Sequence, residues 1–93
     1  MYNFKISDQA KIDLARVMDK QPDILSRLDK LEGDPYKICK KTGIEAIGSY
    51  YINAGNQYSM TFDIDDDAGN IEILRVVRQP FLHKIITKRL SLN

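Results

Sequence analysis

YSMTFDIDDDAGNIEILRVVR, at residues 58–78, is the stretch that decides the fold. From Tyr58 to Asp65 apolar and polar side chains alternate strictly, which is the period of a strand with one buried face. Residues 71–77 are mostly β-branched or aliphatic on both faces, and they predict a second strand that is covered more fully. Between them DDAGN, residues 66–70, combines carboxylates with a Gly and an Asn and predicts the loop of a hairpin.

The alternation also assigns side chains to the two faces of this hairpin. Tyr58, which starts the first strand on its apolar face, is expected in the core, and Ser59 and Thr61 are expected on the polar face. In the second strand one face is expected to carry Ile71, Ile73 and Val77, and the other Leu74 and Val76. A hairpin alone is marginally stable in water, so the remaining chain must cover its apolar face.

The segment before the hairpin predicts one strand and two helices. Residues 2–6 alternate and predict a short first strand. Ser7 and Asp8 offer N-cap oxygens for a first helix, which runs to about Lys20. Pro22 suits the first turn of a second helix, and Gly33 ends it. These two helices form a hairpin whose apolar stripes face each other and the sheet.

The remaining segments complete an α+β two-layer domain. Residues 36–43 are polar and basic and are expected to form a surface connection, and residues 49–53 predict another strand. After Pro80, apolar residues at helical spacing predict a short terminal helix. The predicted order is β-α-α-β-β-β with a short C-terminal helix, an antiparallel sheet packed on the helical hairpin. The expected core comprises Phe4, Ile6, Leu14, Leu28, Phe62, Ile64, Ile73 and Leu74.

Length and composition limit what this chain can be. Its 93 residues suffice for one domain, residues 1–93, and no apolar run approaches a membrane span. The first residues lack the pattern of a signal peptide, and Cys39 is the only cysteine, so a cytoplasmic protein without disulfide or metal is expected. The net charge of +1 gives no reason by itself to invoke nucleic acid, but no acidic residue follows Glu72. One end of the molecule is therefore basic.

Several motifs in this order resemble the RelE/ParE superfamily of toxins from type II toxin-antitoxin modules. An initial strand leads into SDQAKIDL and a helical hairpin, and then Y-x-x-x-F-D-I-D-D, residues 58–66, leads through an acidic turn into IEILRV. The resemblance implies a RelE/ParE-like fold over nearly the whole chain. It also implies an antitoxin protein as partner, with a homodimer as a further assembly left open.

RelE-like toxins cut mRNA in the ribosomal A site with the neighbouring 2′-hydroxyl as nucleophile, without a cofactor. That chemistry needs proton-transfer groups and fixed cations near the phosphate. The resemblance therefore assigns His83, Arg78 and Lys84 as catalytic candidates. The substrate-binding candidates are Arg75, Lys88, Arg89 and Tyr51. The competing interpretation is that His83 is a helix histidine without a catalytic role and that the cations belong to a solvated face.

Other residues depart from the family pattern and keep further functions open. Ser59, Tyr51 and Asn53 stand where the family often has arginines, and His83 stands where a Tyr is often found. A ParE-like, non-enzymatic inhibitor of DNA gyrase is compatible with the missing arginines. A binding protein that keeps the fold and has lost toxicity is a third hypothesis. A ribosome-dependent endoribonuclease that inhibits translation remains the leading prediction.

Overall fold

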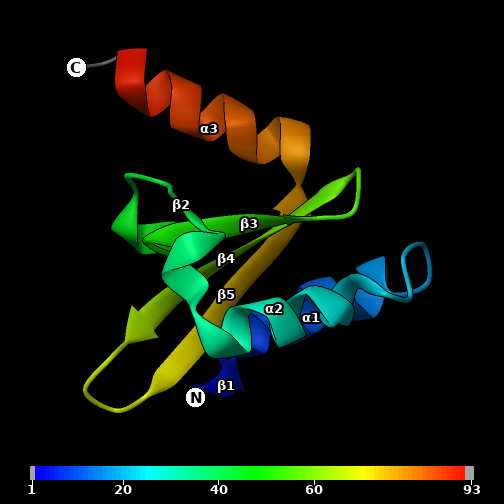
Figure 1. The fold of residues 1–93 in the computed structure, drawn as a ribbon. Helices are drawn as coiled ribbons and strands as arrows, with labels where there is room; N and C mark the ends of the chain where they lie inside the picture. Colours follow the sequence, from blue (N-terminus) through cyan, green and yellow to red (C-terminus); the bar gives the residue numbers. More distant parts are fainter. Residues whose placement is uncertain (1, 92–93) are drawn as a thin grey trace.

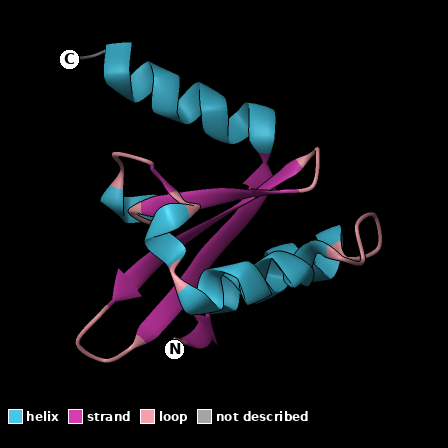
Figure 2. Cartoon of the chain, viewed as in Figure 1, coloured by secondary structure: helices cyan, strands magenta, loops and turns pink. Residues whose placement is uncertain are grey.

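A five-stranded sheet with helices on both faces forms the body of the molecule (Figures 1 and 2). The structure is a computed structural model, and it describes residues 2–91 and the side chains of residues 2–88. In chain order the elements are β1 (Asn3–Ile6), α1 (Asp8–Val17), the 3-10 turn η1 (Ile24–Ser26), α2 (Arg27–Gly33), η2 (Pro35–Lys37), β2 (Lys40–Lys41), η3 (Glu45–Ile47), β3 (Tyr50–Ala54), β4 (Tyr58–Asp65), β5 (Asn70–Arg78) and α3 (Gln79–Ser91). Within residues 2–91, no helix combines the length and the hydropathy of a membrane span.

The sheet is mixed rather than antiparallel. Its strand order is β1-β5-β4-β3-β2, and β1 lies parallel to β5 with Ile6 opposite Ile73. The predicted antiparallel sheet is therefore wrong for β1 and right for the other neighbours. Short turns force β3, β4 and β5 to alternate in direction, whereas β1 reaches β5 only through both helices and three strands. Its direction is consequently set by the course of α1 and not by a turn.

Two predicted segments differ from the structure. Residues 36–43 were expected to be a surface connection, but they contain η2 and the two-residue edge strand β2, which pairs with β3. An exposed edge strand of two lysines has no hydrophobic period by which to recognise it. The second helix begins as η1 and becomes α-helical only at Arg27, and α1 ends at Val17, before Lys20. The predicted Ser7 cap is confirmed, since its hydroxyl accepts a hydrogen bond from the N–H of Ala10 at 3.1 Å.

A bulge in β5 changes which of its side chains reach the core. Thr61 pairs with Arg75 but Phe62 pairs with Ile73, so Leu74 has no partner residue on β4. One extra residue reverses the alternation that follows it. Val76 therefore joins Ile71 and Ile73 in the core, and the predicted place of Val77 beside them is wrong. Leu74, the unpaired residue, is not part of the buried cluster, so its predicted place in the core is wrong.

Strand β4 is buried on both faces from Tyr58 to Phe62, which its alternating sequence does not predict. Ser59 and Thr61 are each 1% exposed, although both were expected on a solvated face. The Thr61 hydroxyl donates to the carbonyl of Ile47, and the Ser59 hydroxyl donates to Oδ1 of Asn53 at 2.8 Å. Buried hydroxyls with partners lose little on leaving water. Helix α3 and the segment around η3 thus form a partial second layer over the polar face.

The main core lies between the sheet and the helical hairpin. Tyr58 is buried there as predicted, and Leu28 packs against the same cluster from α2. The buried hydrophobic residues that form this cluster are Ala10, Leu14, Val17, Ile24, Leu31, Ile52, Ala54, Tyr58, Met60, Phe62, Ile71, Ile73 and Val76.

Truncation of Leu28 tests how tightly the hairpin packs on the sheet. Leu28→Ala is expected to lower the free energy of unfolding by about 2 kcal/mol, near the small end for a leucine because the side chain is half-buried. Urea denaturation at pH 7 measures the change. Ile12→Ala is the matched control on the outer face of α1, where the side chain is 49% exposed, and it should change stability by less than about 0.5 kcal/mol. Equal effects of both variants would contradict this packing.

Candidate functional site

Helix α3 is fixed against the sheet by its first turn. It starts directly after β5, and the N–H of Gln79 donates to the carbonyl of Gln57 at 2.8 Å. The Gln79 side-chain amide donates to the carbonyls of Gly55 at 2.9 Å and Tyr58 at 3.0 Å. Leu82, one turn further, is buried. The helix therefore lies over the face of β3 and β4 that is opposite to α1 and α2.

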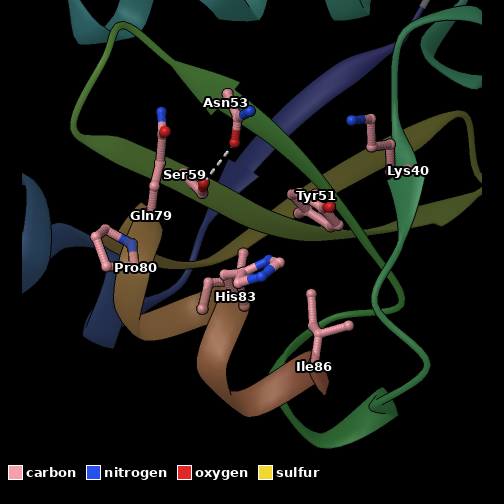
Figure 3. A pocket seen from close by; sticks show the side chains of 9 residues that line it. Lys40, Tyr51, Asn53, Ser59, Gln79, Pro80, His83 and Ile86 are labelled. Atoms are coloured by element: carbon pink, nitrogen blue, oxygen red, sulfur yellow. Dashed lines mark hydrogen bonds between the residues drawn. The ribbon is translucent and has the colours of Figure 1, made fainter. Parts of the chain in front are cut away.

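A cavity of about 460 Å³ lies between α3 and this face (Figure 3). Polar side chains from β2, β3, β4 and α3 line it. Its lining consists of Lys40, Tyr51, Asn53, Ser59, Gln79, Pro80, Leu82, His83 and Ile86. In Figure 3 the His83 imidazole projects from α3 into this space, with Tyr51 on the sheet opposite.

Three of these side chains carry useful chemistry. His83 is exposed, and an imidazole can serve as a general acid or a general base. Lys40 is an exposed cation, and in the described part of the chain no carboxylate pairs with it. The half-buried ring of Tyr51 offers a face for stacking and a hydroxyl for hydrogen bonds. Together they can hold a phosphate beside a base and move a proton next to it.

The structure brings only some of the predicted site residues together. His83 and Tyr51 share the cavity, whereas Arg78 and Lys84 line a different hollow of about 360 Å³ with Pro80 and Phe81. The predicted grouping of His83 with Arg78 and Lys84 at one edge is therefore not seen. Lys88 is exposed on α3. Arg89 falls outside the described side chains, as does Leu90 of the predicted helix stripe.

Arg75 is held by a carboxylate that the sequence did not reveal. Its Nε donates to Oδ2 of Asp13 at 2.8 Å, and the same oxygen accepts the backbone N–H of Val76 at 3.0 Å. Burial raises the pKa of Asp13, but the hydrogen bonds from Arg75, Val76 and Gln9 outweigh it and bring the pKa below its ordinary value. The charge of Arg75 is thus compensated within the protein.

Lys40 is the site residue that sequence reasoning missed. Lys40 belongs to the basic segment 36–43, for which the sequence predicts only a surface connection. The positive charge of that segment was the only sequence feature that pointed to a phosphate contact there. Pairing of Lys40 with Tyr51 across β2 and β3 brings the ammonium-bearing side chain to the same face as the tyrosine.

Two tyrosines form hydrogen bonds to the acidic loop between β4 and β5. Asp66 accepts hydrogen bonds from the hydroxyls of Tyr2 at 2.5 Å and Tyr36 at 2.7 Å. These bonds lower the pKa of Asp66 and raise that of Tyr36. Among the described residues no group of three or more His, Cys, Asp or Glu side chains is placed to hold a metal ion. The two hydrogen bonds to Asp66 tie the loop to Tyr2, just before β1, and to Tyr36 in η2, and none of these three residues lines the His83 cavity.

This chain is similar to a protein of known structure. No protein-family model and no curated protein matches the sequence. The structure is similar to that of a chain in the RelBE2 toxin-antitoxin complex from Mycobacterium tuberculosis, with a TM-score of 0.65 and 25% sequence identity. The match covers 84% of this chain and 98% of the other. The fold is therefore RelE-like, and the resemblance to the RelE/ParE superfamily of toxins that the sequence predicted is confirmed.

Proposed function

We propose that this chain is the toxin of a type II toxin-antitoxin module and that it cuts mRNA on the ribosome, which inhibits translation. The similarity to a chain of a toxin-antitoxin complex supports the first part of the proposal. The His83 cavity supports the second, because it joins one proton-transfer group, one uncompensated cation and one aromatic ring. The chain works in the cytoplasm in this proposal, with a cognate antitoxin as its protein partner.

The reaction requires no group beyond these side chains and water. The 2′-hydroxyl oxygen of a nucleotide attacks the adjacent phosphorus and forms a new P–O bond, while neutral His83 takes the hydroxyl proton. The bond from phosphorus to the 5′ oxygen breaks, and that oxygen leaves with a proton from water. Lys40 offsets the charge that develops on the non-bridging oxygens, and Tyr51 stacks on a neighbouring base. The products are a 2′,3′-cyclic phosphate and a free 5′-hydroxyl.

An assay with purified protein tests this proposal. Translating ribosomes are programmed with a defined mRNA, and primer extension maps new 5′ ends after the protein is added. We expect cuts within codons only when ribosomes are present, and a 5′-hydroxyl at each cut. The product of an adjacent small gene, added in equal amount, should suppress the cuts. Intact mRNA together with inhibited gyrase supercoiling would contradict cleavage and identify a ParE-like toxin instead.

A further inference from the structure

A second cavity lies on the other side of α3, between α1 and the junction of β5 with α3. Its volume is about 440 Å³, and its lining shares no residue with the His83 cavity. Besides Arg75, three cations border it: Arg16 from α1, Lys20 three residues after that helix, and Arg78 from the end of β5. The hollow that contains Arg78 and Phe81 continues it and adds Lys84. We call this surface the basic groove and define it by Arg16, Lys20, Arg78, Phe81 and Lys84.

The positive charge of the basic groove is not compensated. Asp13 is the one carboxylate in the lining of the second cavity, and it is matched by Arg75, with 2.8 Å between Oδ2 and Nε. For residues 2–88, the structure shows no ion pair to Arg16, Lys20 or Arg78. All three are exposed. Positive charge is therefore concentrated here even though the net charge of the whole chain is only +1.

Phe81 is the one large hydrophobic residue that is exposed in the basic groove. Phe81 is 57% exposed, the largest value among the exposed large hydrophobic residues. Its neighbour Leu82 is buried and holds the first turn of α3 on the sheet, so the position of Phe81 on the rim is fixed. Of the valines that line the second cavity, Val17 at 7% and Val76 at 4% exposed offer almost no free surface, and Val77 is half-buried. The most accessible apolar surface of the groove is thus an aromatic face.

We propose that the basic groove binds a single strand of RNA, with Arg16, Lys20 and Arg78 on its phosphates and Phe81 stacked on a base. An electrostatic track beside an exposed aromatic ring is the usual arrangement for a strand bound without sequence preference. An acidic protein segment would also meet the cations, but the most exposed apolar surface here is a planar ring on the rim, which suits stacking on a base. The inference extends the proposed function to a second RNA contact away from the cleavage cavity.

Fluorescence anisotropy with a labelled ten-residue oligouridylate, in the absence of ribosomes, tests this site. The affinity of the intact protein is measured at several salt concentrations. The double variant Arg16→Ala/Lys20→Ala should reduce the slope of log affinity against log salt by about 1.4, since each lost phosphate contact with a single strand removes about 0.7. Phe81→Ala should weaken binding by about five- to hundredfold through the lost stacking. Lys30→Ala, an exposed cation on α2 outside the groove, is the matched control and should change neither quantity.

Each outcome decides the inference, and it does so independently of cleavage. Loss of RNA binding in the groove variants but not in Lys30→Ala, with unchanged melting temperatures, would support the groove even if the ribosome assay showed no cuts. Equal binding by all variants, or no binding by the unaltered protein, would overturn it. Binding of a labelled decapeptide of alternating Glu and Leu in place of the RNA, lost in the same variants, would overturn it as well and assign the groove to an acidic protein segment.

Discussion

Replacing His83 with alanine is expected to lower the rate of ribosome-dependent mRNA cleavage by about 10²–10⁴-fold, the usual effect of removing a proton-transfer group. The imidazole of His83 is the group of this cavity to which the proposal assigns proton transfer. Because the side chain is exposed on α3, its removal should change stability by less than about 0.5 kcal/mol. Single-turnover cleavage of ribosome-bound mRNA, with a melting curve of each protein, measures both effects.

A matched substitution on the same helix separates catalysis from a general disturbance of α3. Thr87 lies one turn after His83, is exposed and does not line the cavity. Thr87→Ala should therefore cleave at the rate of the unaltered protein. Lys40→Ala should cleave slowly but keep the pH dependence of the unaltered protein, since it removes a charge near the phosphate and no proton carrier. Full cleavage by the His83 variant would remove the proton-transfer role and favour a toxin that acts by binding.

The parts of the fold that sequence predicts are those decided by local chemistry. Strict alternation from Tyr58 to Asp65 and the DDAGN loop predicted β4, β5 and their antiparallel pairing, which the structure shows. Ser7 predicted the start of α1 because its hydroxyl needs only the N–H of Ala10. In each case the partners stand close together in the chain.

The parts that the sequence did not predict depend on contacts between distant residues. Because of the bulge at Leu74, Val76 lies in the core in place of the predicted Val77. No local sequence pattern indicates that a residue within a strand will be unpaired. Burial of Ser59 and Thr61 follows from α3 and η3, which cover a face that looks solvated by alternation. The direction of β1 depends likewise on a crossover through the helices.

The candidate site divides in the same way. His83 and Tyr51 were found from their chemistry alone, and both line the cavity. Lys40 was missed because a two-residue edge strand carries no period, although its pairing with Tyr51 brings it to the site. Arg75 was expected to meet substrate, but 62 positions separate it from Asp13, which binds it. A charge can be read from a sequence, whereas its compensation requires the fold.

Asp13 connects α1 to the bulge of β5, and its removal should have the largest effect on stability. The side chain is 6% exposed, and its Oδ2 satisfies both Nε of Arg75 and the N–H of Val76. Asp13→Ala leaves that N–H buried without a partner and the guanidinium unpaired. Breaking a buried ion pair typically costs about 3–5 kcal/mol, and we expect about 3 kcal/mol here because Arg75 is 42% exposed and can be hydrated again.

The pH dependence of stability distinguishes the charge of Asp13 from its shape. The pKa of Asp13 is lower in the folded protein than the ordinary value of 3.8, so the folded state binds fewer protons than the unfolded state. The stabilisation by the ionised carboxylate is therefore complete above pH 3.8 and is lost as the pH falls through the folded pKa. Asp13→Asn keeps an oxygen for Val76 but cannot ionise. Urea denaturation gives the free energy of unfolding of the unaltered protein and of Asp13→Asn. The difference between these two free energies should therefore be large at pH 7, almost as large at pH 5, and shrink steadily below about pH 4. A difference that stays constant down to pH 2 would mean that packing around Asp13, and not its ion pair with Arg75, holds α1 to the bulge.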